Sequence, residues 1–209
     1  MNVARAYCRL AELGRPVVRT SEVAAVLAES PFAASKTMAR LATAGLVRPI
    51  RHGLFWIVAG AIDPYVLPEY LTDPYASYVS LQTALYLHGM IEQIPDVIYV
   101  VSLGRTSRIR TTVGTFSVHR IGPSLFGGFS VRTNGVKVAW PEKALVDIAY
   151  LSSNKTRLFK ALPELELPRG FRHALAREWI AKLPSGRTRA RVEQAYASLT
   201  RGGPTRARR

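Results

Sequence analysis

The sequence predicts an α+β protein, and three observations support this fold class. Apolar residues recur at helical spacing through residues 3–45 and again after residue 140. Between these parts, residues 96–140 contain the alternating and β-branched stretches that are typical of strands. Apolar residues make up 48% of the 209 residues, which is enough to bury a core.

Two helices are expected first. The stretch VARAYCRLAEL (residues 3–13) has apolar residues at helical spacing and stops before Gly14. The stretch RTSEVAAVLAES follows, with Thr20 or Ser21 as the expected N-cap and an apolar stripe behind it.

A third helix and a β-hairpin complete the first 60 residues. After the turn SPF, the stretch AASKTMARLATAG predicts a helix with Met38 and Leu41 facing inward. Residues 46–50 and 54–58 are expected to form two short strands around a basic turn. This order of elements is typical of a winged helix-turn-helix, which we assign to residues 1–60.

A winged helix suits DNA, because its third helix fits the major groove and its hairpin tip reaches phosphates or the minor groove. The side chains expected to contact DNA are Ser35, Lys36, Thr37, Arg40, Arg48, Arg51 and His52. The alternative is a winged helix that acts only as a protein–protein module, with Lys36 and Arg40 as part of a solvated face.

The net charge of +15 is unevenly distributed along the chain. Residues 1–60 hold 8 Lys and Arg against 3 Asp and Glu, residues 61–151 hold 7 of each, and residues 152–209 hold 14 against 4. A polyanion such as DNA is the natural partner of the basic parts. Solubility, or the general basicity of a proteome, is the alternative explanation.

A linker is expected over residues 61–77, which hold three prolines and no clean period, with Tyr65, Tyr70 and Tyr75 docking on a second domain. This second, α+β domain is assigned to residues 78–200. It is expected to combine a small antiparallel or mixed sheet with following helices. Residues 201–209 are expected to form a basic, disordered tail.

The second domain is expected to begin with a helix over residues 78–91 that starts at Ser80 and stops near Gly89. Strands are expected over residues 96–104 and 114–122. Residues 129–140 predict a hairpin whose Asn134-Gly135 forms a type I′ turn. His88 lies near the end of its helix, where a structural or capping role is the simplest interpretation.

The stretch WPEKALVDIAYL (residues 140–151) predicts a further helix, with Pro141 in its first turn. Ala144, Leu145, Ile148 and Leu151 are expected to form its buried stripe. Lys143 and Asp147 are spaced i, i+4 and are expected to pair on the surface of this helix. The remaining helices are expected in NKTRLFKALPELEL, GFRHALAREWIAKL and RTRARVEQAYASL.

Known catalytic motifs are missing from the sequence. It contains no Walker A loop, GxGxxG, HExxH, GxSxG or CxxC, and no usual protein-kinase set. His, Asp and Glu spacings suggest no metal site, and no cofactor is expected. A single cysteine, Cys8, allows no intrachain disulfide, which fits a reducing compartment. With no signal-peptide pattern and no long apolar run, we expect a cytoplasmic protein without a membrane partner.

The order of four stretches resembles the AbiEi-type antitoxins of type IV toxin–antitoxin systems, known from phage abortive infection. The stretches are RHGLFWI, YVSLQTALYLHGMI, SRIRTTVGTFSVHRI and WPEKALVDIAYL, and the resemblance covers roughly residues 15–155. The basic helical end is similar to that of members from high-GC actinobacteria, including mycobacteria.

The resemblance implies a bacterial antitoxin encoded beside a nucleotidyltransferase-like toxin. Such antitoxins bind inverted repeats in operator DNA and repress their own operon. Their C-terminal domain counters the toxin without needing a stable complex and often adds DNA contacts through a basic face. Arg105, Arg108, Arg110 and Arg120 fall where that face would be, and a solvated surface is the alternative for them.

How the toxin is silenced stays open at this point. One alternative is direct inhibition by masking the toxin's nucleotide site. Another is an atypical serine protein kinase that uses ATP and Mg²⁺, for which Lys143, Asp147, Asp96 and His88 are the candidate residues. A third is action on the toxin's target. A plain winged-helix transcriptional regulator with a ligand-sensing domain is an alternative to the antitoxin function itself. We expect that this protein is not an enzyme.

Overall fold

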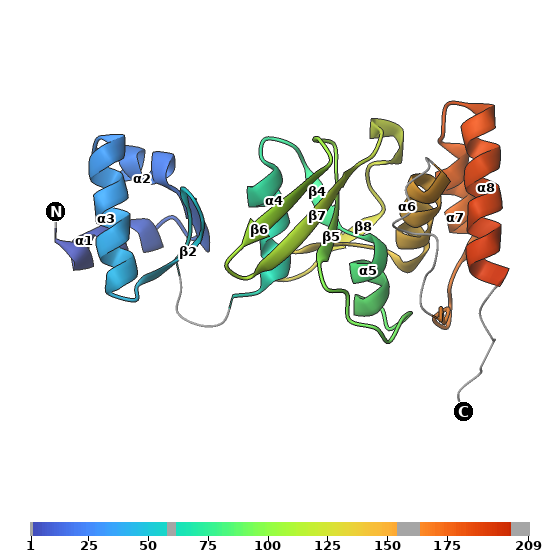
Figure 1. Cartoon of the computed structure of the whole chain (residues 1–209), viewed down its shortest axis with the longest axis horizontal. Coiled ribbons are helices and arrows are strands. Elements are labelled where there is room, and N and C mark those ends of the chain that lie inside the picture. Colours follow the sequence, from blue (N-terminus) through green and yellow to red (C-terminus); the bar gives the residue numbers. More distant parts are fainter. Residues whose placement is uncertain (1, 58–61, 154–163, 202–209) are drawn as a thin grey trace.

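The computed structural model describes residues 2–57, 62–153 and 164–201 and is α+β, with two sheets (Figure 1). A unit of helices and a small sheet lies at one end of the molecule, a larger sheet lies in the middle, and a group of helices lies at the other end. The predicted fold class is therefore confirmed at the level of α+β.

The N-terminal unit, residues 2–57, contains three helices and a three-stranded antiparallel sheet with the order β1-β3-β2. Its elements are α1 (Val3–Ala11), β1 (Val17–Arg19), α2 (Thr20–Leu27), α3 (Pro31–Thr43), β2 (Val47–Arg51) and β3 (Leu54–Ile57). Strand β1 was not expected, and it explains why the predicted caps of α2 are wrong. Because β1 runs directly into α2, Arg19 occupies the N-cap position and its amide donates to Glu22 Oε2 at 2.8 Å.

Helix α3 begins earlier than expected. The Ser30 hydroxyl caps it by accepting a hydrogen bond from the Ala33 amide at 3.2 Å, and Pro31 occupies the first turn, where its missing N–H costs nothing. The predicted turn SPF is therefore the cap and first turn of α3. Met38 and Leu41 are fully buried, as predicted.

The larger sheet is mixed and has the strand order β6-β7-β5-β4-β9-β8. Its strands are β4 (Ser77–Val79), β5 (Ile98–Ser102), β6 (Ser107–Thr111), β7 (Gly114–Arg120), β8 (Phe129–Val131) and β9 (Lys137–Ala139). Strand β6 was not expected, because its sequence SRIRT offers only one large apolar residue. Helices α5 (Leu81–Leu87) and α6 (Pro141–Ser153) pack together, and α4 (Leu67–Thr72) packs near β4.

The β8–β9 hairpin has a different turn from the one predicted. A type I′ turn needs a positive φ at both Asn134 and Gly135, and only Gly135 has one, at 82°. The Arg132 carbonyl accepts from the Gly135 amide at 2.8 Å, and the Arg132 amide donates to the Val136 carbonyl at 2.8 Å. This pattern is that of a three-residue loop with a bulge at the glycine.

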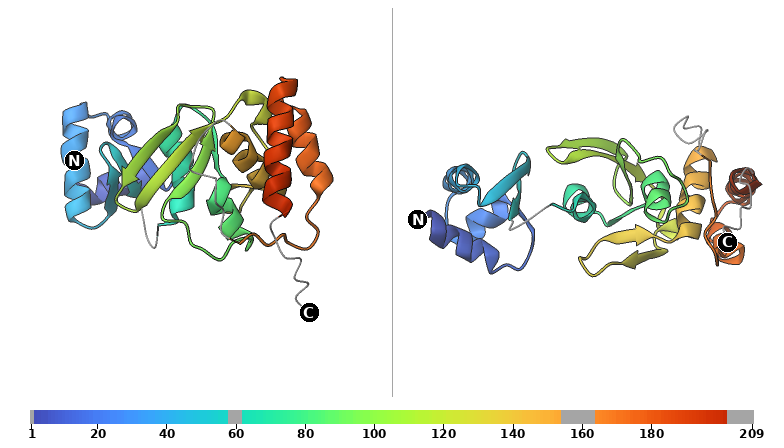
Figure 2. Two further views of the ribbon diagram at one scale, coloured as in Figure 1. Left: turned by 45° about the vertical axis from the view of Figure 1, so that its right-hand side comes forward. Right: turned by 90° about the horizontal axis from the view of Figure 1, so that it is seen from below.

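The two sheets share a hydrophobic core. Residues alternate along the small sheet, so that one face packs on α1–α3 and the other packs on the larger sheet and α4. The second face supplies Val17, Ile50, Leu54 and Trp56, which meet Leu67, Leu71, Val100, Phe116 and Val118. Figure 2 shows the small sheet between the N-terminal helices and the larger sheet.

Polar contacts reinforce this junction. The Thr112 amide donates to the Ile50 carbonyl at 3.0 Å, and the Thr112 hydroxyl donates to the Pro49 carbonyl at 2.8 Å. Arg19 binds the Tyr70 carbonyl and forms an ion pair with Asp73 at 3.3 Å. Residues 61–77 were predicted to form a linker with no clean period. Their described part instead contains a 3₁₀ turn (Pro64–Val66), α4 and the first residue of β4.

Helices α6, α7 (His173–Ala181) and α8 (Gly186–Arg201) form the end of the molecule opposite the N-terminal unit (Figure 1). Most of the helix expected in NKTRLFKALPELEL and residues 202–209 of the expected tail lie outside the described residues. Arg201, expected in that tail, is the last residue of α8. In the described ranges, no helix has the length and apolar character needed to cross a membrane.

Candidate nucleic-acid interface

Helix α3 presents a solvent-exposed face that carries cations and no carboxylate. Ser35, Lys36, Ala39 and Arg40 are exposed, whereas Ala34, Met38 and Leu41 on the opposite side are buried. The sequence of α3 contains no Asp or Glu. The small sheet lies between α3 and the larger sheet (Figure 2).

Thr37 is the exception among the predicted contact residues in α3. Its side chain is buried, with 2% of the residue exposed, so it cannot reach a base directly. Its hydroxyl donates to Glu29 Oε2 at 2.9 Å and accepts from an Arg40 guanidinium nitrogen at 3.1 Å. Glu29 therefore fixes the orientation of the hydroxyl, and the hydroxyl in turn positions Arg40.

These side chains line a shallow groove beside α3. Its volume is about 600 Å³, and its walls are Glu29, Ala33, Lys36, Thr37, Ala39 and Arg40. The groove thus brings together three of the residues predicted from sequence and adds Glu29, which sequence reasoning missed because it lies before the helix. Its carboxylate accepts the hydrogen bond from the Thr37 hydroxyl.

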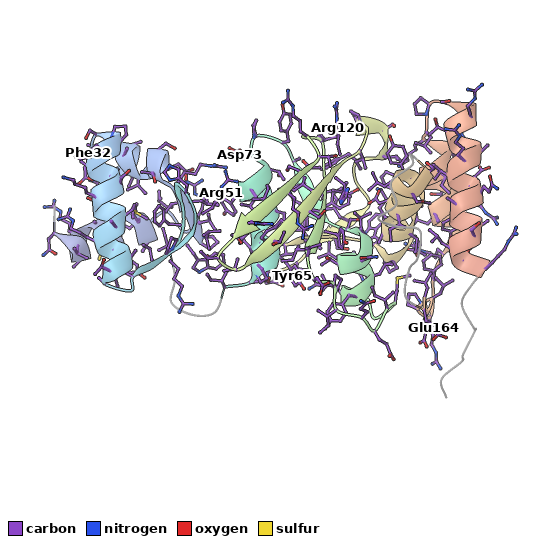
Figure 3. All side chains as sticks on the ribbon, in the orientation of Figure 1. Phe32, Arg51, Tyr65, Asp73, Arg120 and Glu164 are labelled. Carbon is purple, nitrogen blue, oxygen red and sulfur yellow. The ribbon has the colours of Figure 1, made fainter. Side chains whose placement is uncertain are left out.

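The β2–β3 hairpin supplies the other predicted cations of this unit. Arg48, Arg51 and His52 are exposed, and the loop between the strands consists of His52 and Gly53 alone. Arg51 lies at this tip (Figure 3). The hairpin is short, one of its faces is buried in the junction with the larger sheet, and the Pro49 and Ile50 carbonyls at its edge accept from Thr112. Its exposed side chains, Arg48, Arg51 and His52, are the accessible part.

The predicted basic face of the second domain is divided. Arg105, Arg108, Arg110 and Arg120 are all exposed. Arg108 and Arg110 lie opposite Ser117 and Thr115 in the sheet, on one face. Arg120 follows Phe116 and Val118 at two-residue spacing, so it shares their face, which is opposite to that of Arg108 and Arg110. Figure 3 marks the position of Arg120. The sequence could not assign these arginines to different faces of the sheet, because strand β6 was not predicted and its register was unknown.

The residues proposed for catalysis in the kinase alternative do not form one site. Lys143 and Asp147 are fully buried, whereas Asp96 is exposed in the loop before β5. His88 ends α5, and its Nε2 donates to the Ala139 carbonyl at 2.7 Å, which is the structural role expected for it. The expectation that Lys143 and Asp147 pair on a helix surface is wrong, because α6 is covered on nearly all sides.

Lys143 and Asp147 belong to a buried polar cluster that joins α6 to β4. Lys143 Nζ donates to Asp147 Oδ1 and to the Tyr78 hydroxyl, the latter at 2.8 Å. Asp147 Oδ2 accepts from the Tyr78 hydroxyl at 3.0 Å and from the Ser80 hydroxyl at 2.7 Å. The ammonium also lies 5.2 Å from the ring centroid of Trp179. Every oxygen of the carboxylate is therefore bonded, as a buried charge requires.

Burial controls the proton equilibria of this cluster. It lowers the pKa of Lys143 and raises the pKa of Asp147, while each charge opposes the shift of the other. It also raises the pKa of Tyr78 well above its ordinary value, and the Asp147 charge adds to this shift. Gly128 is needed for close packing here, since a Cβ at its position would lie 2.8 Å from Lys143 Cγ. The side chains of Lys143, Asp147, Tyr78 and Ser80 are all buried.

A metal-binding group is also not found in the described ranges, where no three His, Cys, Asp or Glu side chains are arranged to hold an ion. Comparison with known proteins adds no assignment: no protein-family model matches the chain, and no curated protein matches it. The α3 face and the β2–β3 hairpin therefore remain the best-defined candidate site, and their exposed side chains carry positive charge.

Proposed function

We propose that this chain is a DNA-binding antitoxin of the AbiEi type, which represses its own operon and counteracts a nucleotidyltransferase-like toxin. The N-terminal unit acts as a winged helix-turn-helix, with α3 in the major groove and the β2–β3 hairpin beside it. The observation that carries the proposal is the acid-free, exposed face of α3 with Lys36 and Arg40, backed by a fully buried opposite face.

The order of elements supports this proposal. Helices α2 and α3 are separated by a short turn and followed by a hairpin, and the hairpin carries exposed cations at Arg48 and Arg51. A helix that presents polar residues from one face fits the width of the major groove, and hairpin cations are placed to contact phosphates. The resemblance of four stretches to AbiEi-type antitoxins supports the biological role.

A role without catalysis is the form that the geometry favours. The kinase alternative needs an accessible lysine and carboxylate to hold nucleotide and metal. Lys143 and Asp147 have no exposed surface, and neither Asp96 nor His88 joins them. We therefore propose that the toxin is silenced by contact and not by phosphorylation.

DNA binding is tested with the full chain and the DNA upstream of its own gene. Fluorescence anisotropy should show tighter binding to this duplex than to a scrambled duplex of equal length at the same salt concentration. The double variant Lys36→Ala, Arg40→Ala should lose this preference. Arg187→Ala, Arg191→Ala is the matched control, because it removes the same charge from exposed positions in α8 at the far end of the molecule. Equal loss in both double variants would contradict the proposal.

The antitoxin role is tested by co-expression with the adjacent toxin gene. The full chain should restore growth. The intact mass of the toxin should stay unchanged after incubation with the chain, ATP and Mg²⁺, whereas a kinase would add about 80 Da per phosphate. An Asp147→Ala variant is a poor control for catalysis, because removing a buried, fully bonded carboxylate destabilises the fold itself.

A further inference from the structure

Phe32 is the large apolar residue with the highest exposure among the described residues, at 70%. It is the second residue of α3, one turn before Lys36 and two turns before Arg40. A single exposed apolar side chain is common on protein surfaces and by itself needs no explanation. Its position is the informative feature, because it stands at the N-terminal end of the face that carries the exposed cations. Figure 3 shows it there.

The ring is coupled to the first of these cations. Lys36 Nζ lies 4.4 Å from the centroid of the Phe32 ring, which is a cation–π distance. Residues spaced i, i+4 lie one above the other on a helix, so Phe32, Lys36 and Arg40 form one continuous stripe. The stripe therefore offers an apolar group first and two hydrogen-bond donors after it.

The major groove presents a matching pattern. Residues near the N-terminus of a recognition helix contact base edges, and the C5-methyl group of thymine is the apolar group that bases display there. We propose that Phe32 is a specificity-determining residue that recognises a thymine through its C5-methyl group. This inference rests on the proposed DNA-binding function and goes beyond it by naming the chemical group of DNA that Phe32 contacts.

Charge argues against a protein occupant for this stripe. A second copy of the chain, packed through the same face about a two-fold axis, would bring Lys36 and Arg40 against their own counterparts. The face contains no acid of its own to pair with them, and the nearby Glu29 carboxylate is already bonded to Thr37. A polyanion that also displays methyl groups satisfies both the cations and the ring.

The test starts from duplexes that the full chain selects out of a random DNA library. Each thymine of the selected consensus is replaced in turn by uracil, which removes only the methyl group. Wild-type chain should lose about fourfold in affinity at one thymine per half-site, the loss expected for exposing one methyl group. Phe32→Ala should bind the thymine and uracil duplexes equally well.

A matched control is Ile94→Ala, which truncates another exposed apolar residue, at 68% exposure, in the loop before β5. This variant should keep the full response to uracil. Thermal unfolding of Phe32→Ala should match that of wild type, because an exposed ring contributes little to the core.

The outcomes separate this inference from the proposed function. If selection enriches a consensus but no uracil weakens binding, or if the uracil effect persists in Phe32→Ala, the role of Phe32 is wrong while DNA recognition stands. If Phe32→Ala changes only the oligomeric state measured by sedimentation, the ring serves a protein contact and the inference is again overturned. If selection enriches no sequence, both fail together.

Discussion

The Thr37 hydroxyl links two charged side chains at the edge of the α3 face. It donates to Glu29 and accepts from Arg40, so a buried, uncharged residue determines where an exposed cation points. Such a residue contributes to binding by positioning another residue. Its replacement is therefore expected to affect DNA affinity without removing a charge.

Thr37→Val keeps the shape of the side chain and removes the hydroxyl. Arg40 then loses its anchor, and we expect specific DNA binding to weaken about two- to twelvefold, which corresponds to one hydrogen bond of about 0.5–1.5 kcal/mol. Anisotropy titrations at fixed salt measure the effect. Thr37→Ser should restore most of the affinity, and a Ser variant as weak as the Val variant would contradict a positioning role.

His119 is expected to make stability depend on pH. It is 5% exposed, its Nε2 lies 2.9 Å from the Ser117 hydroxyl, and burial lowers its pKa below 6.5. The unfolded chain therefore binds this proton more readily than the folded chain. Above about pH 6.5 both states leave the ring neutral, and as the pH falls below this value the free energy of unfolding decreases.

Urea titrations at pH 7.5, 6.5 and 5.5 measure this dependence. His119→Gln should flatten the decline between pH 6.5 and 5.5. His52→Gln, at the exposed hairpin tip, is the control and should retain it. A decline that is equally steep in His119→Gln would show that other groups cause it.

At the level of elements, the cluster of Lys143, Asp147, Tyr78 and Ser80 fixes helix α6 to strand β4. Lys143→Met leaves the Asp147 carboxylate buried without its counter-ion, and we expect a loss of about 3–5 kcal/mol in the free energy of unfolding. The double variant Lys143→Met, Asp147→Leu should lose less than the single variant, because no unpaired charge remains. Urea unfolding of both variants tests this, and a double variant with a lower free energy of unfolding than the single variant would contradict it.

The junction between the two sheets is expected to make the N-terminal unit dependent on the rest of the chain. Leu67 of α4 is fully buried in the core that both sheets share. Leu67→Ala should cost about 2–5 kcal/mol. It should also accelerate hydrogen exchange in both the β2–β3 hairpin and β7. Acceleration confined to α4 would show that the two units unfold independently.

The same junction affects how the protein is dissected. A fragment of residues 1–60 would expose Val17, Ile50, Leu54 and Trp56 to water. Poor DNA binding by such a fragment would therefore not identify the arginines of the second domain as DNA contacts. Point substitutions in the full chain give the cleaner answer.

For the whole molecule, basic residues are found at both ends of the described structure. The α3 face lies at one end and the arginines of α8 at the other (Figure 1).

The salt dependence of DNA affinity tests whether the β2–β3 hairpin contacts phosphates. Arg51→Ala should lower the slope of log affinity against log salt by about one, since each neutralised phosphate contributes about 0.9. Arg191→Ala should leave the slope of binding to a short operator duplex unchanged. An unchanged slope in Arg51→Ala would remove Arg51 from the phosphate contacts.

Local sequence determined much of this fold. Turn residues, caps and apolar periodicity were sufficient to predict α1, α3, β5, β7 and the β8–β9 hairpin, because these signals act over a few residues. The same signals assigned Lys36 and Arg40 to α3 and Arg51 and His52 to the hairpin turn, and all four are exposed.

Only the tertiary structure decided which polar residues are buried and which faces meet. Strands β1 and β6 are short or polar and are held by pairing with β3 and β7, which no local pattern reveals. Lys143 and Asp147 look like a surface pair in the sequence, and they are buried because partners 65 to 69 residues away complete their hydrogen bonds. The physical reason is the same in each case: long-range pairing and burial outweigh local propensity.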